Sequence, residues 1–249
     1  MPLPRLQLFE FNDARWAPSI VRDTLVDSLS RAIRWGGLLD GIVAPLRECL
    51  RRAETNAVLD LCAGAGGPAA VLSSALPDVD FLLSDLYPQV DAWKSAGLRF
   101  ISEPIDATNI PPSLGEDRVR LLVNALHHFP PPLARDVLRG LCAGNSPGVF
   151  IAEGLVRNPL SFAAMGPVGL ASLLSTPILA PKRRLLATAL LPASLAASVW
   201  DGTVSALRIH TPSELYAMVA ELPGWEWSWG EYQHSAGLGR GTWFRGTRR

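Results

Sequence analysis

The sequence has little that would suggest a disulfide, a structural zinc site or a nucleic-acid partner. It contains 3 cysteines, Cys49, Cys62 and Cys142, which are widely spaced and odd in number. This pattern predicts neither disulfides nor zinc ligands, and it makes a reducing compartment the default. The 23 basic and 23 acidic residues leave a formal net charge of +0. Because binding to a phosphate backbone requires a clustered basic surface, we expect no nucleic-acid partner.

Long uninterrupted apolar runs are also missing. The first residues show no apolar run followed by a small-residue cleavage site, so no signal peptide is predicted. The most apolar stretch lies within 155–207, where Pro167 and Pro177 interrupt it. A membrane-spanning helix needs about 20 consecutive, predominantly apolar residues. We therefore expect a cytoplasmic protein that does not span a membrane.

What the sequence does contain is a strand, a glycine-rich turn and a helix in direct succession, over 56–76. Residues 58–61 are apolar apart from Asp60 and predict a buried strand. Small residues fill 63–67, and an Ala- and Leu-rich helix begins near Pro68, where a missing N–H costs little. Glycines let a ligand approach the backbone, and the helix N-terminus offers unpaired N–H groups. This stretch therefore predicts a nucleotide-type ligand.

Strands and helices alternate after this turn. We expect strands at 79–86, 98–105, 119–126 and 148–153, helices at 90–96, 132–142 and 215–222, and a closing hairpin at 225–232 and 241–245. The last of these helices begins with a capping box, Thr211 to Glu214. Alternation of this kind predicts a parallel sheet with helices on both faces, which binds its ligand at the carboxyl ends of the strands.

Two classes of cofactor fit the glycine spacing. A dinucleotide turn has the pattern G-x-G-x-x-G, and here Gly64 and Gly66 are followed by alanine in place of the third glycine. Asp85 lies about 20 residues further on, where either cofactor would use a carboxylate for its ribose. Asp60, inside the strand before the turn, and Asp106, at the end of the third expected strand, are two further carboxylates that separate this segment from the dinucleotide pattern.

These motifs resemble those of the class I S-adenosylmethionine-dependent methyltransferases, in their small-molecule branch. The string LDLCAGAGG is similar to the first motif of that family, LLSDLYP to the end of its second strand, EPIDATNIP to its adenine-binding segment and NALHHFP to its fourth-strand motif. The resemblance covers 56–153 and implies S-adenosyl-L-methionine as cofactor and S-adenosyl-L-homocysteine as product. It implies cofactor contacts from Asp60, Cys62, Ala63, Gly64, Gly66, Asp85, Leu86, Asp106, Ala107, Asn124 and Ala125.

The resemblance also implies a role for several of these residues. Asp60 would lie near the amino group of the methionyl moiety, Asp85 would bond the ribose hydroxyls, and Asp106 would bond the adenine amine. Leu86 would flank the adenine, and the backbone around Asn124 would lie near the sulfonium. The whole chain further resembles a bacterial subgroup with an FEFND…W…P start and a WDG-x-VS-x-LR segment.

The resemblance predicts an α/β fold, with a doubly wound, mostly parallel, seven-stranded Rossmann-like sheet and an antiparallel C-terminal hairpin. We expect a single methyltransferase domain over 1–249. Its parts are a helical N-terminal lid (1–53), a cofactor-binding core (54–154), a long apolar helical cap insertion after the fifth strand (155–208) and a closing helix with the hairpin (209–249).

Candidate substrate-binding residues lie outside the core. Glu10 and Trp16 belong to an aromatic and polar segment ahead of the first helix, which either closes over the ligand site as a lid or serves only packing. Asp201 and Arg208 either form an ion pair that fixes the cap, or Arg208 clamps a substrate carboxylate. The cap itself is either a packed cover or the wall of an apolar substrate pocket, with peripheral membrane contact through the basic residues 182–184 as a further alternative.

His127 and His128 are the candidate catalytic residues. They follow the fourth predicted strand, and imidazole titrates near neutrality, so either could act as a general base or orient a substrate hydroxyl. The alternative is one hydrogen-bonded structural histidine and one that faces solvent. Alternating tryptophans at 225, 227 and 229 are expected to pack on the sheet. No paired-cysteine or His-x-x-x-His spacing indicates a metal site.

The sequence therefore predicts a methyltransferase that acts on a small, largely apolar metabolite, such as one from natural-product biosynthesis, by in-line displacement. We expect a monomer or homodimer with a small-molecule substrate as its partner. An NAD-linked oxidoreductase and a non-catalytic, cofactor-binding or membrane-surface protein remain as alternatives.

Overall fold

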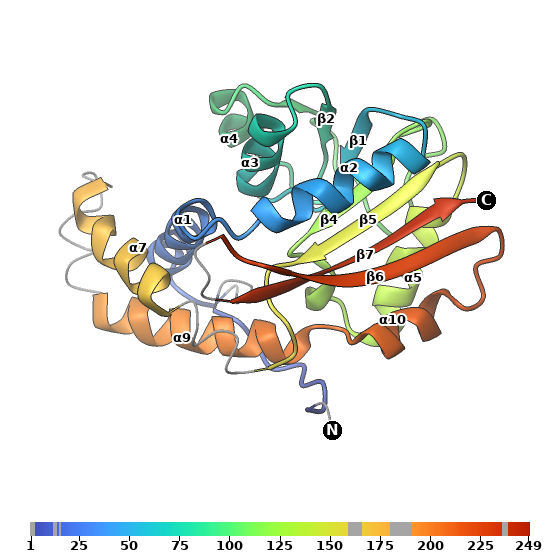
Figure 1. Cartoon of the computed structure of the whole chain (residues 1–249). Helices are drawn as coiled ribbons and strands as arrows, with labels where there is room; N and C mark the ends of the chain where they lie inside the picture. The colour runs from blue at the N-terminus through green and yellow to red at the C-terminus, as the bar shows by residue number, and fades with distance from the viewer. Residues whose placement is uncertain (1–2, 12–13, 15, 159–165, 180–190, 236–238) are drawn as a thin grey trace. The chain divides into compact units, whose positions relative to one another are not determined.

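The computed structural model describes residues 3–11, 14, 16–158, 166–179, 191–235 and 239–249 (Figure 1). The chain divides into two compact units. The helical unit contains 1–38, 155–209 and 233–240, and the sheet unit contains 39–154, 210–232 and 241–249.

The sheet unit is built on a 7-stranded sheet with the strand order β3-β2-β1-β4-β5-β7-β6. Strands β1 to β5 are parallel, and β7 runs antiparallel to β5. This order confirms the predicted α/β fold with a mostly parallel sheet and an antiparallel C-terminal hairpin. The strands are β1 (Ala57–Asp60), β2 (Asp80–Leu83), β3 (Arg99–Phe100), β4 (Val119–Val123), β5 (Gly148–Glu153), β6 (Trp225–Gln233) and β7 (Arg240–Arg248).

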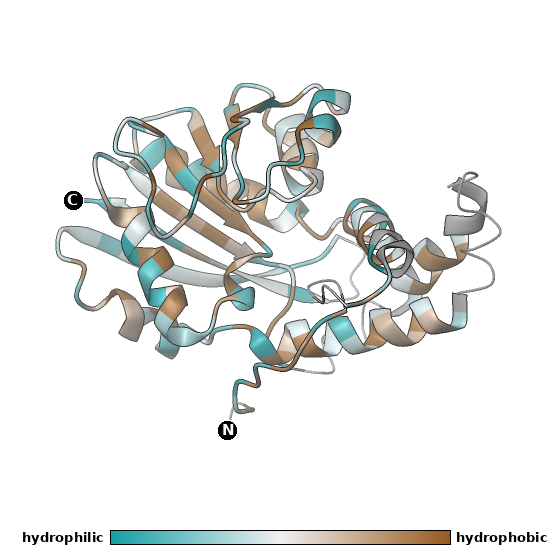
Figure 2. Cartoon of the chain, turned by 180° about the vertical axis from the view of Figure 1, so that it is seen from behind, coloured by the Kyte–Doolittle hydropathy of each residue, from teal (hydrophilic) through white to brown (hydrophobic). Residues whose placement is uncertain are grey.

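The middle strands β4 and β5 form the centre of the core. Every residue of both strands is buried, and these strands are drawn mainly brown in Figure 2. Apart from Arg120 and Glu153 both strands lack charged residues, and such largely apolar strands are typical of a parallel sheet that is covered on both faces. The cover consists of η1 (Asp40–Ile42), α2 (Val43–Arg52), α3 (Gly67–Ala75), α4 (Val90–Ser95), η2 (Leu126–His128), α5 (Pro131–Cys142) and α10 (Pro212–Val219).

The amphipathic pattern explains how these helices dock. Helix α2 buries Leu46, Cys49 and Leu50, which share one face at helical spacing, and it contacts β5. Helix α10 packs on α5 and begins with the predicted capping box, in which Thr211 and Glu214 bond each other's backbone N–H.

Several predicted strands are longer than the observed ones. The expected strand at 98–105 reduces to Arg99–Phe100, because its neighbour β2 ends at Leu83 and offers no further residue to pair with. The strand expected at 119–126 ends at Val123, since Asn124 adopts a left-handed conformation with φ of 53°. The strand expected at 79–86 spans only Asp80–Leu83.

The tryptophans of β6 pack as predicted. The rings of Trp225 and Trp227 stack with centroids 5.6 Å apart, and Trp227 stacks on Phe244 of β7 at 4.9 Å. These residues belong to or border the main hydrophobic cluster of the sheet unit. They therefore stabilise the hairpin rather than form a binding cage.

The helical unit consists of α1 (Ser19–Trp35), α7 (Gly166–Leu179) and α9 (Leu191–Arg208), which contact one another. Helix α1 begins directly after Pro18, its N-cap, and Gly36 is its C-cap. The hydroxyl of Ser172 in α7 donates to the carbonyl of Ser28 in α1 at 2.5 Å, and Arg31 donates to the carbonyl of Ser172 at 3.2 Å.

No helix in the described part of the chain combines the length and the apolar character that crossing a membrane requires. The basic residues 182–184, which carried the prediction of membrane contact, lie outside the described residues.

Candidate functional site

The carboxyl ends of the parallel strands meet at one edge of the sheet. Asp60 at the end of β1 is level with Leu83 of β2 and with Leu121 of β4, and Val123 of β4 is level with Ala152 of β5. The polar residues that end these strands therefore gather at the edge where open α/β sheets bind their ligands.

The two left-handed glycines of the glycine turn have different surroundings. Gly64 has φ of +52°, and a Cβ placed on it would meet no atom within 4 Å. Gly66 is the N-cap of α3 with φ of +81°, and a Cβ there would lie 2.9 Å from a ring carbon of Trp93. Gly66 thus permits close packing, whereas the Cα of Gly64 faces open space that a ligand can occupy.

Asp85 joins this turn to the end of β2. One of its carboxylate oxygens accepts the Gly64 N–H at 2.9 Å, and the other accepts the Tyr87 N–H at 2.8 Å. The indole N–H of Trp93 donates to the Gly64 carbonyl at 2.9 Å. The position of the carboxylate beside the open glycine is therefore fixed by the backbone, and the neighbouring Leu86 is 44% exposed.

Asp60 is a buried carboxyl group close to Asp85. Only 2% of Asp60 is exposed, and burial followed by the charge of Asp85 raises its pKa to about 8. The described residues provide no hydrogen bond to its side chain. A buried, perturbed carboxyl group of this kind is a candidate for binding a cationic group of a ligand.

Cys62 lies among the predicted carboxylates. It has a left-handed backbone with φ of 61°, and burial raises the pKa of its thiol to about 12. The charges of Asp85, Asp60 and Asp106 add to this increase. The structure thus brings these carboxylates around one thiol, which is held in the unreactive, protonated form.

Asp106 does not end a strand, in contrast to the prediction. It lies in the loop after β3, is exposed, and accepts hydrogen bonds from the Thr108 N–H at 2.8 Å and hydroxyl at 2.7 Å. Ala107 beside it is 6% exposed. A Cβ on Gly140 of α5 would come within 2.4 Å of the Ala107 carbonyl, so this loop packs closely on α5.

Asn124 connects β4 to the chain after β5. Its side-chain oxygen accepts the Gly154 N–H at 2.6 Å, and its own N–H donates to the Ala152 carbonyl at 2.8 Å. Ala125 next to it is buried. The turn after β4 is therefore held in one conformation, with its backbone at the carboxyl edge of the sheet.

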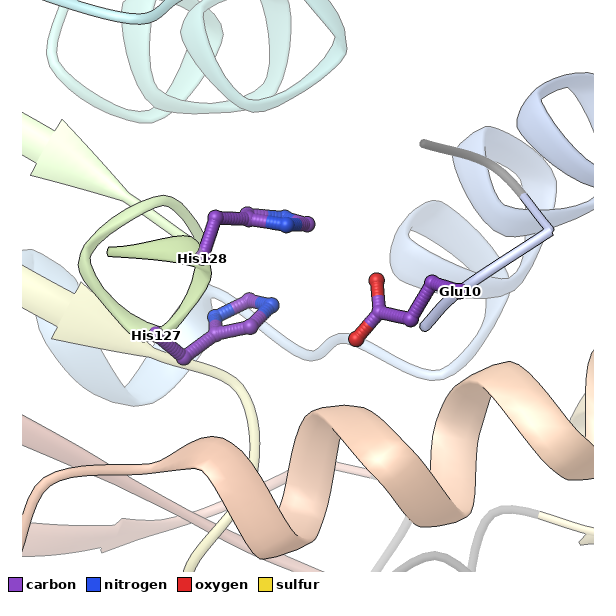
Figure 3. Close-up of side chains that lie close together, drawn as sticks. All are labelled: Glu10, His127 and His128. Atoms are coloured by element: carbon purple, nitrogen blue, oxygen red, sulfur yellow. The ribbon is translucent and has the colours of Figure 1, made fainter. Parts of the chain in front are cut away.

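His127 is held by a carboxylate that sequence reasoning missed. Its backbone N–H donates to Glu153 Oε1 at 3.0 Å, and its Nδ1 lies 2.7 Å from Glu153 Oε2. The rings of His127 and His128 have centroids 4.2 Å apart, and Figure 3 shows them one above the other. The signal for Glu153 was present in GVFIAE, where a single carboxylate ends an otherwise apolar strand.

The candidate substrate residues belong to the helical unit. Glu10, which Figure 3 also labels, pairs with Arg208 at 3.1 Å, while Asp201 accepts the Phe11 N–H at 2.7 Å. The expected Asp201–Arg208 ion pair is thus replaced by two separate contacts, because seven helical residues place the two about 10 Å apart along the axis. Trp16 is 69% exposed.

No protein-family model matches this sequence, and no curated protein matches it. Solved structures do match. TnmH has 21% identity and a TM-score of 0.51 over 89% of this chain. The magnesium protoporphyrin IX methyltransferase ChlM from Synechocystis PCC 6803, with bound SAM, has 13% identity and a TM-score of 0.52 over 98% of this chain. The O-methyltransferase NcsB1 from neocarzinostatin biosynthesis, in complex with S-adenosyl-L-homocysteine and 1,4-dihydroxy-2-naphthoic acid, has 15% identity and a TM-score of 0.54 over 92% of this chain.

The chain spans all of ChlM, but only 56% of TnmH and 59% of NcsB1. At these identities the likeness concerns the fold. The chain therefore has the fold of class I methyltransferases, in agreement with the resemblance of its motifs.

Proposed function

We propose that this protein is an S-adenosylmethionine-dependent methyltransferase that acts on a small, largely apolar acceptor. The observation that carries the proposal is the strand order, with an antiparallel β7 between β5 and β6, in a fold shared with structures that hold this cofactor or its product. A dinucleotide-binding sheet has the order 3-2-1-4-5-6. The NAD-linked alternative is therefore less well supported.

The glycine turn and the carboxylates fit this cofactor. The open space at the Cα of Gly64 accommodates the close approach of a ligand, and Asp85 beside it carries two oxygens that suit a pair of ribose hydroxyls. Asp60, buried and without a hydrogen bond from the described residues, suits the ammonium group of the methionyl moiety.

The cofactor, when bound, supplies an electrophilic methyl group. The protein's own contribution to an in-line displacement is to align the acceptor and to exclude water. For an acceptor that carries a proton, we assign His127 as general base. Because Glu153 Oε2 engages Nδ1, the Nδ1–H tautomer is favoured, and Nε2 keeps the lone pair that accepts the proton.

Glu153 is then a positioning residue rather than a catalytic one. It bonds both the backbone and the ring of His127, so it fixes the tautomer and the orientation of the imidazole. Such a carboxylate also stabilises the imidazolium that forms when His127 accepts a proton. The His128 ring lies beside this imidazole, with the ring planes tilted by 34° and the centroids 4.2 Å apart.

The test is transfer of a labelled methyl group from S-adenosylmethionine to a panel of phenols and carboxylic acids. We expect a labelled product with wild type, and a loss of about 100-fold or more in kcat for His127→Gln. Glu153→Gln should lower kcat about tenfold or more and shift the pH profile, with binding of S-adenosylhomocysteine unchanged. His128→Gln, which leaves the contact between Glu153 and His127 in place, is the comparison variant and should lower kcat much less than His127→Gln.

Full activity of His127→Gln would contradict the assignment of the base. Failure of wild type to bind S-adenosylmethionine would contradict the proposed function itself.

A further inference from the structure

The N-terminal segment lies along helix α9, and hydrogen bonds from this helix hold it there (Figure 1). We call residues 5–11 the strap. The indole N–H of Trp200 donates to the Phe9 carbonyl at 2.9 Å, and Asp201 accepts the Phe11 N–H at 2.7 Å. Nearly two turns further along the helix, the Leu6 N–H donates to the Leu207 carbonyl at 3.2 Å. Phe9 and Phe11 of the FEFND motif are therefore bonded to Trp200 and Asp201 of the WDG-x-VS-x-LR motif.

A buried ion pair fixes the middle of the strap. Glu10 and Arg208 are 3.1 Å apart, and their side chains are only 3% and 5% exposed. Ser205 donates to Glu10 at 2.9 Å, and Arg208 also donates to the Leu8 carbonyl. Burying two charges brings little net stability, but it enforces one geometry, because either charge without its partner is strongly destabilising.

The strap holds its aromatic rings around an open pocket that lies wholly within the helical unit. Phe9 is 5.3 Å from the Trp200 ring and 5.7 Å from the Trp16 ring, and Phe11 is 5.6 Å from Trp16, all between centroids. Alanines of α9, among them Ala196, form the opposite wall. The pocket has a volume of about 520 Å³, within the range of pockets that bind small molecules.

These rings are not used to build a core. Trp16 is 69% exposed, Phe9 49% and Trp200 38%, although the Trp200 indole is hydrogen-bonded to the Phe9 carbonyl. No charged side chain lines the pocket among the described residues, so neither a cation nor an anion has a counter-charge there. Ring faces without charge favour a planar aromatic ligand through offset and edge-to-face contacts.

We propose that this pocket binds the planar aromatic part of an uncharged acceptor. The identification of the ligand as the methyl acceptor rests on the proposed function, whereas the binding of an aromatic ligand does not. It assigns substrate recognition to Phe9, Phe11, Trp16 and Trp200, and it gives Glu10, Asp201 and Arg208 the task of holding the strap.

The experiment measures binding of 2-naphthol by calorimetry and by quenching of tryptophan fluorescence. Ala196→Trp fills the pocket, whereas Leu195→Trp places the same ring on the same helix outside the lining and is the matched control. We expect Ala196→Trp to weaken 2-naphthol binding at least about tenfold and Leu195→Trp to leave it within about twofold. Trp16→Ala, at an exposed position, should weaken it several-fold without loss of folding.

Measuring the binding of S-adenosylhomocysteine distinguishes failure of this inference from failure of the proposed function. It should be equal in wild type and Ala196→Trp. If wild type binds 2-naphthol but not S-adenosylhomocysteine, the proposed function fails while the pocket stands.

Equal 2-naphthol affinity in wild type, Ala196→Trp and Trp16→Ala would overturn the pocket. Tighter binding of tetramethylammonium than of 2-naphthol would overturn the ligand class. Self-association, or sedimentation with neutral lipid vesicles, that Ala196→Trp abolishes would also overturn the ligand class. The pocket would then bind a second copy of the chain or a membrane surface.

Discussion

Asp60 should make cofactor binding steeply dependent on pH. Burial and the charge of Asp85 raise its pKa from 3.8 to about 8, so the folded protein without ligand carries Asp60 mainly protonated at pH 7. If Asp60 receives the ammonium group of the cofactor, only the ionised form binds well. Binding must then release the proton.

The size of the effect follows from this pKa. With a pKa of about 8, about 1% of Asp60 is ionised at pH 6 and about half at pH 8. A ligand that requires the ionised form should therefore bind about 50-fold more tightly at pH 8 than at pH 6. At pH 7 about 0.9 proton should be released for each ligand bound.

Calorimetry with S-adenosylhomocysteine measures both quantities. This product carries the same amino group as the cofactor, and titration in buffers with different ionisation enthalpies counts the protons released. Asp60→Asn should bind more weakly at pH 8 and should lose the pH dependence between pH 6 and 8. An unchanged affinity across this range in wild type, with no proton released, would refute the assignment of Asp60.

The same carboxyl group should also affect folding stability. Below the unfolded pKa of 3.8, both states are protonated and Asp60 has no effect. As the pH rises towards about 8, the unfolded state has lost the proton that the folded state retains, so the free energy of unfolding falls. The decrease is at most about 1.4 kcal/mol per pH unit. Thermal melts should therefore show Asp60→Asn gaining stability relative to wild type between pH 5 and pH 8.

Further substitutions test the glycine turn and the strap. Gly66→Ala should lower the free energy of unfolding by about 2–4 kcal/mol, because its Cβ would lie 2.9 Å from an indole carbon at positive φ. Gly64→Ala should cost about 1–2 kcal/mol and mainly weaken cofactor binding; equal melting temperatures for the two variants would contradict this difference. Glu10→Gln should destabilise by about 3–5 kcal/mol, because it removes the negative charge that faces the buried Arg208 guanidinium at 3.1 Å. A melt of Glu10→Gln that matches the exposed control Glu103→Gln would refute the structural importance of the pair.

Local patterns were sufficient for the central part of the fold. The buried strands, the glycine turn and the capping box at Thr211 depend on residues close in sequence, and each is found where it was predicted. Strand lengths were less predictable. The two residues of β3 show that the length of a strand depends on the neighbouring strand and on the path of the following loop. The hydrophobic periodicity of the sequence contains information on neither.

The contacts that define the candidate sites were not predictable for a related reason. Glu153 bonds a histidine 26 residues earlier, and Asp201 bonds a backbone N–H 190 residues earlier. Pairing at such separations is decided by strand order and helix docking. The sequence therefore indicated Asp201 and Arg208 as polar residues of interest, but not that each of them binds the strap.

The most direct test of the central claim compares two ligands on wild type and on Asp85→Asn. Calorimetry should show one S-adenosylhomocysteine bound per wild-type chain, no binding of NAD, and a loss of at least about tenfold in affinity in Asp85→Asn, where a charged hydrogen-bond acceptor is removed. Binding of NAD without binding of S-adenosylhomocysteine would contradict the account.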